Sequence, residues 1–104
     1  MVRAVRDLLA ANLAAAPTLA EAAHHLRVST RTLHRRLAEE GSSYRAIKDL
    51  VRRELALERL ARRGQSVAAT ALELGYSEPS AFFRAFQGWT GEAPSDYRKR
   101  HRPR

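Results

Sequence analysis

The sequence predicts an all-α fold of about seven helices. It is rich in alanine and arginine, poor in β-branched residues, and holds only five glycines and four prolines. Apolar residues recur every three or four positions, and hydroxyl caps and glycine stops divide the chain into segments of helix length. Because the chain has 104 residues, one continuous unit is the default expectation.

The first two helices are delimited by Pro17 and the cap that follows it. We expect one helix over residues 2–15, ended by Pro17. Thr18 is the N-cap of a second, short helix, and Glu21 stands where a capping box requires it. The expected core residues of these helices are Val5, Leu8, Leu9, Leu13, Leu19, Ala22, Ala23 and Leu26.

A third helix is predicted between a hydroxyl cap and a glycine. Ser29 or Thr30 caps it, Leu33 and Leu37 lie one above the other on its buried side, and Gly41 ends it.

A longer helix follows over residues 43–63. Ser42 or Ser43 opens it and Gly64 stops it, so about twenty residues at 1.5 Å each give a length of about 30 Å. Its expected apolar face comprises Tyr44, Ile47, Leu50, Val51, Leu55 and Leu60.

Three helices are predicted in the remainder. Ser66 caps a helix over residues 67–74, which Gly75 ends in the left-handed conformation. The next helix begins at Ser77 or Glu78. Its core face is formed by Phe82, Phe86 and Trp89. Proline in the first turn marks the starts of the last two helices, at Pro79 and Pro94.

The chain contains an internal duplication. Residues 18–29 match residues 66–77 at an offset of 48 positions, with the same order of hydroxyl cap, alanine-rich turns, leucine and closing serine. The following helices match at an offset of 49, pairing Leu33 with Phe82, Arg35 with Arg84 and Leu37 with Phe86. Each repeat has the outline of a helix-turn-helix. The first unit covers residues 18–41, residues 43–63 join it to the second, and residues 66–98 hold the second unit with a closing helix.

The charge favours a nucleic acid as partner. Nineteen lysines and arginines against eleven acidic residues give a net charge of +8, and the pI of 11.2 is far into the basic range. Charge alone leaves DNA, RNA and anionic membranes open, but the apolar stretches are too short to span a bilayer, and we expect no membrane partner.

Several chemistries are excluded or disfavoured. The absence of cysteine rules out disulfides and zinc–thiolate sites. His24 and His25 are adjacent, point in different directions and have no further ligands at suitable spacing, so no metal and no cofactor are expected. No nucleophile–base pair, phosphate loop or HExxH motif indicates an enzyme.

In a helix-turn-helix the second helix enters the major groove, with one apolar face held to the domain and donors on the other. The outward residues are Thr30, Arg31, His34 and Arg35 in the first unit and Glu78, Ser80, Phe83 and Arg84 in the second. Arginine can donate two bonds to guanine, and Phe83 could touch a thymine methyl. A rigid connector about 30 Å long approaches the separation of two readers one helical turn, or about 34 Å, apart on DNA.

With these residues in place, the chain resembles the DNA-binding domain of the AraC/XylS family of bacterial transcription regulators. The resemblance covers residues 8–98 and is most specific in "VAATALELGYSEPSAFFRAFQGWTGEAPSDYR" at 67–98. It implies two recognition helices in successive major grooves of promoter DNA. The implied base-reading residues are Arg31, Thr32, His34, Arg35, Pro79, Ser80, Phe83 and Arg84. The residues that begin the two recognition helices, Ser29, Thr30, Ser77 and Glu78, are expected to contact phosphates.

The resemblance carries further expectations. It implies a cytoplasmic regulator, RNA polymerase as a second partner, and an effector or dimerisation domain preceding this one in the full-length protein. The chain is either an excised C-terminal domain, which we favour, or a free-standing regulator, and we expect it to be monomeric alone. Arg27 stands where the second unit has Gly75, so the first turn either strains a non-glycine residue or takes another shape. The alternative function is a basic helical module that binds RNA or a protein partner without reading DNA sequence.

Overall fold

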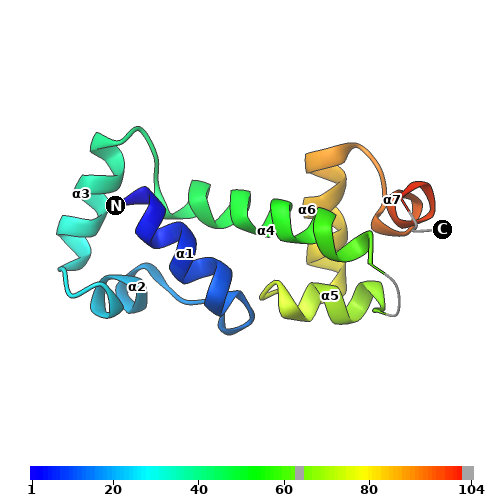
Figure 1. The fold of residues 1–104 in the computed structure, drawn as a ribbon, viewed down its shortest axis with the longest axis horizontal. Coiled ribbons are helices and arrows are strands. Elements are labelled where there is room, and N and C mark those ends of the chain that lie inside the picture. Colours follow the sequence, from blue (N-terminus) through cyan, green and yellow to red (C-terminus); the bar gives the residue numbers. More distant parts are fainter. Residues whose placement is uncertain (63–64, 102–104) are drawn as a thin grey trace. The chain divides into compact units, whose positions relative to one another are not determined.

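The computed structural model describes residues 1–62 and 65–101, and over these residues the chain is all-helical. The predicted fold class is therefore confirmed. The chain divides into two compact units, Met1–Val51 and Arg52–Arg104. Figure 1 shows the helices of each unit along the chain. The longest helix, α4 (Tyr44–Leu60), contributes residues to both units.

The first unit begins with α1 (Val2–Asn12), which continues as a 3-10 helix, η1 (Leu13–Ala15). The single helix predicted over residues 2–15 is thus wrong in its last turn, which tightens before Ala16 enters the left-handed region at φ 47° and the chain reaches Pro17. The next helix is α2 (Leu19–His25). Its predicted capping box is confirmed, since Thr18 Oγ1 accepts from the Glu21 amide at 3.1 Å.

The turn between α2 and α3 (Thr30–Glu39) contains a left-handed arginine. Arg27 has φ 59°, and its amide donates to His24 O at 3.1 Å. The Val28 amide donates to Ala23 O at 3.0 Å, which completes a Schellman ending. Of the two shapes left open for this turn, the strained one is therefore present.

The core of the first unit is aliphatic. The helix α1 buries Val5 and Leu9, and Tyr44 at the start of α4 donates its hydroxyl to Pro17 O at 2.6 Å. The buried apolar side chains are Val5, Leu9, Leu13, Ala22, Ala23, Leu33, Leu37, Ile47 and Val51. Burial of each valine, leucine or isoleucine among them stabilises the unit by about 1.5 to 3 kcal/mol.

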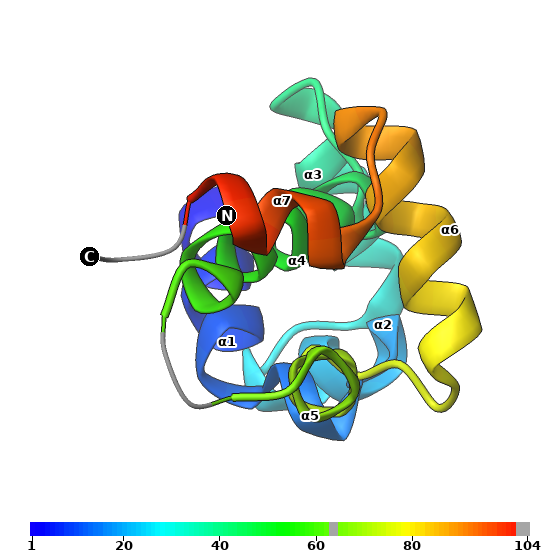
Figure 2. The same ribbon diagram turned by 90° about the vertical axis from the view of Figure 1, so that its right-hand side faces the viewer.

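The second unit holds the end of α4, then α5 (Val67–Glu73), α6 (Pro79–Thr90) and α7 (Pro94–Arg100). Figure 2 shows α6 with the connection to α5 at one of its ends and the connection to α7 at the other. Gly75 ends α5 with φ 87°, as predicted, and the Tyr76 amide donates to Ala71 O at 3.1 Å. This is the same Schellman ending as in the first unit, now with glycine at the left-handed position.

The core of the second unit combines aromatic rings with the buried aliphatic residues Ala56, Leu60, Ala71 and Leu74. The Phe82 and Phe86 rings are fully buried with their centroids 5.8 Å apart, and Phe86 lies 5.5 Å from the Tyr97 ring. The half-buried Trp89 lies 6.3 Å from Phe86 in an edge-on arrangement. The three-residue core face predicted for α6 is confirmed, with Trp89 at its margin.

Two features predicted for α4 are wrong. The helix ends at Leu60 and does not reach residue 63, while residues 63 and 64, and with them the expected glycine stop, lie outside the described residues. Leu50 is 45% exposed, whereas Ala56 is fully buried. The buried residues follow the stripe of Ile47, Val51, Ala56 and Leu60, and Leu50 lies to one side of it.

Candidate nucleic-acid interface

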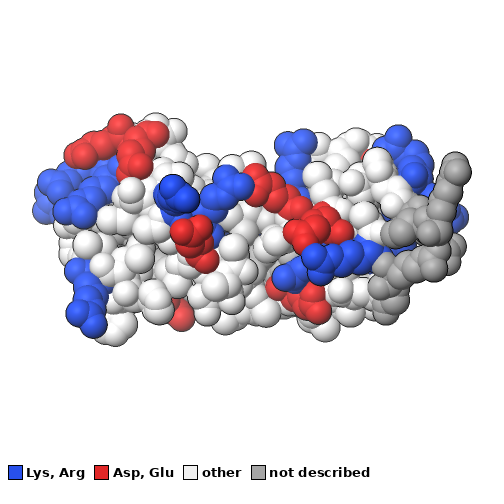
Figure 3. All heavy atoms as spheres, viewed as in Figure 1, with Lys and Arg blue, Asp and Glu red and all other residues white. Residues whose placement is uncertain are grey.

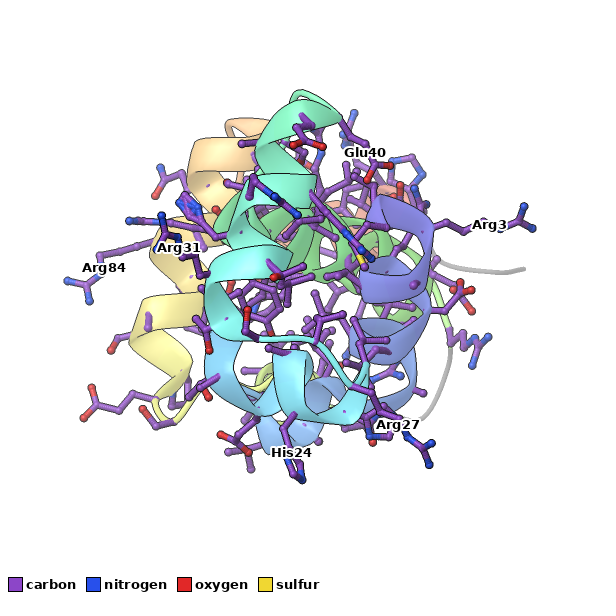
Figure 4. The ribbon with its side chains drawn as sticks, turned by 90° about the vertical axis from the view of Figure 1, so that its left-hand side faces the viewer. Arg3, His24, Arg27, Arg31, Glu40 and Arg84 are labelled. Atoms are coloured by element: carbon purple, nitrogen blue, oxygen red, sulfur yellow. The ribbon has the colours of Figure 1, made fainter. Side chains whose placement is uncertain are left out.

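In the first unit, α3 presents an exposed basic face opposite its buried leucines. Leu33 and Leu37 are fully buried, while Arg31, His34 and Arg35 are exposed at positions that adjoin on the helix surface. Figure 4 shows Arg31 extending away from the ribbon of α3. The helix is thus anchored by two leucines and leaves its hydrogen-bond donors accessible.

The cap of α3 accounts for two further predicted residues. Ser29 Oγ accepts from the Thr32 amide at 3.0 Å and donates to Thr32 Oγ1 at 2.8 Å. Thr32 is half-buried, and its side chain is directed to the cap. Ser29 and Thr32 therefore form part of the helix start, while Thr30 lies exposed beside them.

The exposed face of α3 borders two hollows in the surface of the first unit. One, of about 610 Å³, is lined by Leu19, Thr30, Arg31, His34, Arg35 and Ala38. The other, of about 280 Å³, is lined by Leu19, His34, Ser43, Tyr44 and Arg45. Leu19 and His34 line both hollows, so an apolar residue of α2 and the imidazole of α3 adjoin both. Sequence reasoning missed Leu19, Ala38 and Arg45, because their place beside α3 depends on how the first unit packs.

In the second unit, α6 presents a different exposed face. Its N-cap is Glu78 and not Ser77, and the Glu78 side chain makes no cap hydrogen bond. Pro79 occupies the first turn, where its missing amide hydrogen costs nothing. The exposed residues of α6 include Pro79, Ser80, Phe83 and Arg84. Figure 4 shows Arg84 extending away from the α6 ribbon.

The two equivalent arginines differ in their surroundings. Arg35 Nε lies 3.7 Å from Glu39 Oε1, an exposed pair one helical turn apart. Four residues after Arg84 stands Gly88, which offers no carboxylate. The guanidinium of Arg35 is therefore partly neutralised on its own helix, whereas α6 places no acidic group at the equivalent position.

An acidic group also closes α3. Glu40, the C-cap residue labelled in Figure 4, lies 3.1 Å from the Met1 ammonium. The hydrogen bond from this ammonium, together with one from the Val2 amide, lowers the pKa of the Glu40 carboxyl.

Much of the basic charge outside the two recognition helices is used within the fold. Arg52 Nε donates to Leu74 O at 3.0 Å, and its guanidinium lies 4.3 Å from the Tyr76 ring centroid. Arg59 pairs with Glu73 at 2.9 Å, and Arg62 pairs with Glu58. Figure 3 shows acidic and basic side chains mixed along the middle of this face, and both kinds present at its α3 end. Arg52, Arg59 and Arg62 therefore each have a partner within the fold.

Two absences concern the described residues alone. No helix among residues 1–62 and 65–101 is long and apolar enough to cross a bilayer. The same residues contain no group of three or more metal-binding side chains, and His24 and His25 remain exposed on α2.

The fold and the two exposed faces define a double helix-turn-helix domain, and a family profile described as a helix-turn-helix domain matches residues 19–100. The Ornithine utilization regulator of Pseudomonas aeruginosa is 43% identical over 95 residues, covering 91% of this chain and 28% of that protein. The chain therefore spans less than a third of the length of this curated relative.

Solved structures of transcription regulators share this fold. A DNA-binding transcriptional dual regulator from Escherichia coli K-12 has a TM-score of 0.91 and 30% identity, over 96% of this chain and 90% of that one. A probable AraC family transcriptional regulator from Rhodopseudomonas palustris has a TM-score of 0.77 and 28% identity, over 98% of this chain and 97% of that one. The chain belongs to the AraC family of helix-turn-helix transcription regulators, which confirms the resemblance noted in the sequence.

Proposed function

We propose that this chain is the part of a bacterial transcription regulator that binds double-stranded promoter DNA in a sequence-specific way. Residues 18–41 and 66–98 act as two readers, and residues 43–63 act as the connector. The observation that carries the proposal is the pair of recognition helices, each anchored by two buried apolar residues and each exposing an arginine at the equivalent place, Arg35 and Arg84.

Base reading is assigned to the exposed positions of α3 and α6. Arginine donates two bonds to the O6 and N7 atoms of guanine, and His34 and Ser80 can bond to base edges. Thr32, Pro79 and Phe83 complete the base-reading set, of which Thr32 is turned toward the cap. Phosphate contact is assigned to the residues that begin the two helices, Ser29, Thr30, Ser77 and Glu78. Glu78 would contact a phosphate through its backbone amide, because its carboxylate repels one.

The remaining expectations extend to the full-length protein. We propose that the domain acts by binding alone, without catalysis, metal or cofactor, in the cytoplasm. Activation would add RNA polymerase as a second partner. The effector or dimerisation domain would lie outside this chain, which spans 28% of the Pseudomonas regulator, and the chain by itself would be monomeric.

Selection from a randomised duplex library tests this function. We expect enrichment of a two-part motif whose centres lie about one helical turn, or about 34 Å, apart. Affinity for the selected duplex should fall steeply with salt, because phosphate contacts release counterions.

Competition supplies the control for this selection. The selected duplex should compete far better than a shuffled duplex or an RNA of the same sequence. Equal competition by all three would contradict sequence-specific reading and would support the RNA-binding or protein-binding alternative.

A further inference from the structure

The second recognition helix exposes an aromatic ring where the first exposes an imidazole. Phe83 on α6 is 44% exposed, and its equivalent on α3 at the offset of 49 positions is His34. A phenyl ring carries no conventional hydrogen-bond donor or acceptor, so the exposed part of Phe83 can contact a partner mainly through its apolar surface. The position is therefore suited to an apolar partner.

The ring is held by the core. Its centroid lies 6.3 Å from the centroid of the fully buried Phe82 ring, in a tilted arrangement. The Phe83 ring thus lies at aromatic-pair distance from a core residue, and this contact favours its observed orientation.

The surroundings of the ring are polar. On the α6 surface its neighbours one turn before and after are Ser80 and Gln87, Arg84 follows it in the sequence, and all three are exposed. An apolar ring surrounded by hydrogen-bond donors is complementary to base edges that carry hydrogen-bonding groups and one apolar group. In the major groove the apolar group is the 5-methyl of thymine.

Resting on the proposed DNA binding, we propose that Phe83 reads the 5-methyl group of a pyrimidine in the half-site bound by α6. The half-site bound by α3 is read at the equivalent position by a hydrogen bond from His34. The second half-site would thus distinguish thymine from uracil, and 5-methylcytosine from cytosine, which no hydrogen bond in the major groove can do.

The test uses the duplex enriched in the selection, with each thymine replaced singly by deoxyuridine. At one thymine of one half-site, uracil should lower affinity threefold to fivefold, about the effect of one buried methyl group. The variants Phe83→Ala and Phe83→His should bind the thymine and uracil duplexes equally. Cytosine at that position should bind more tightly once it is methylated at C5.

A second exposed apolar residue supplies the matched control. Leu72 on α5 is 58% exposed, and Leu72→Ala should leave the uracil penalty unchanged. Thermal melting of both Phe83 variants checks that they fold, and Phe83→His decides the question if Phe83→Ala does not.

Two results overturn this inference while DNA binding stands. In one, the wild type tolerates uracil at every thymine; in the other, the penalty persists in both Phe83 variants. The first result would point to a ring wedged between base pairs or used only in packing, and the second to a methyl group read by another side chain. Failure to enrich any duplex contradicts the proposed function itself, and this inference with it.

Discussion

In the first unit the turn before the recognition helix places Arg27 at φ 59°, whereas in the second unit the same position holds Gly75 at φ 87°. The backbone hydrogen bonds are alike, from Val28 to Ala23 O at 3.0 Å and from Tyr76 to Ala71 O at 3.1 Å. A left-handed conformation costs a non-glycine residue about 1 to 2 kcal/mol. The packing of the first unit therefore imposes a shape that the second adopts without this cost.

The helices that precede α2 and α5, namely α1 and α4, can also be compared by the spacing of their residues. The helix α1 buries Val5 and Leu9, and buried Leu13 follows in η1; the same spacing on α4 holds Arg52, Ala56 and Leu60. Arg52 thus stands where the first unit has a fully buried valine. At this position the first unit packs an aliphatic side chain, whereas the second unit uses a cation.

Arg52 holds the turn of the second unit. It donates to Leu74 O at 3.0 Å and Gly75 O at 3.3 Å, which lie at the carboxyl end of α5. It also lies over Tyr76, whose ring is 5.5 Å from Phe82 of α6. One side chain therefore links α4 to both helices of the second reader. Its positive charge lies at the carboxyl end of α5, where it also interacts favourably with the helix dipole.

The largest expected effect on stability is that of Arg52→Met. It removes the two bonds to carbonyls and the contact with Tyr76 while keeping an apolar stem, and should lower the unfolding free energy by about 2 to 3 kcal/mol. Urea denaturation measures the loss. The exposed neighbour gives the control, since Arg53→Met should change stability by less than about 0.5 kcal/mol. Equal effects would show that the Arg52 contacts contribute no stability.

Exchanging the turn residues comes next. Gly75→Ala should destabilise the chain by about 1 to 2 kcal/mol, because it forces a Cβ into the left-handed region. Arg27→Gly should stabilise it by about 0.5 to 1 kcal/mol, since the relieved strain exceeds the added freedom of the unfolded chain. Thermal or urea melts compare the two. Opposite signs are expected, and destabilisation by both would mean that the Arg27 side chain has a structural contact.

The helix starts offer a smaller contrast. Ser29→Ala should cost about 1 kcal/mol, because Ser29 Oγ caps α3 by accepting from the Thr32 amide. Ser77→Ala should be close to neutral, because the N-cap of α6 is Glu78. Urea melts of both variants test whether the change of offset from 48 to 49 moves the N-cap from the serine to the residue that follows it. A cost at Ser77 as large as that at Ser29 would contradict this.

The smallest expected effect concerns the ion pair on α3. Glu39→Gln frees Arg35 from an exposed pair that is worth at most about 1 kcal/mol. Affinity for the selected duplex should rise modestly and the salt dependence should steepen. Gln87→Glu introduces a carboxylate on the exposed side of α6 and should lower affinity. An unchanged affinity in both variants would indicate that neither helix face approaches DNA.

Local chemistry made much of the fold predictable. The capping box at Thr18, the left-handed stop at Gly75 and the buried pair Leu33 and Leu37 each depend on residues a few positions apart. The role of Arg52 could not be predicted, because its carbonyl acceptors lie 22 and 23 residues further along the chain.

Other details depended on packing that a one-dimensional pattern does not contain. The exposure of Leu50 and the burial of Ala56 follow from which side of α4 meets its neighbours. Within the candidate interface, the exposure of Arg31, His34 and Arg35 followed from helical spacing. The lining of both hollows by Leu19 could not be predicted in this way, because Leu19 belongs to a different helix.

The central claim is that α3 and α6 each read their own half-site. The most direct measurement is the affinity of the wild type, Arg35→Ala and Arg84→Ala for the selected duplex and for two derivatives, each with the guanines of one half-site replaced. Each variant should lose about 1 to 3 kcal/mol on the parent duplex. The affinity of Arg35→Ala should then be unchanged by guanine replacement in one half-site. The affinity of Arg84→Ala should be unchanged by guanine replacement in the other. Equal sensitivity of both variants to both replacements would contradict separate reading and would reduce the two arginines to phosphate contacts.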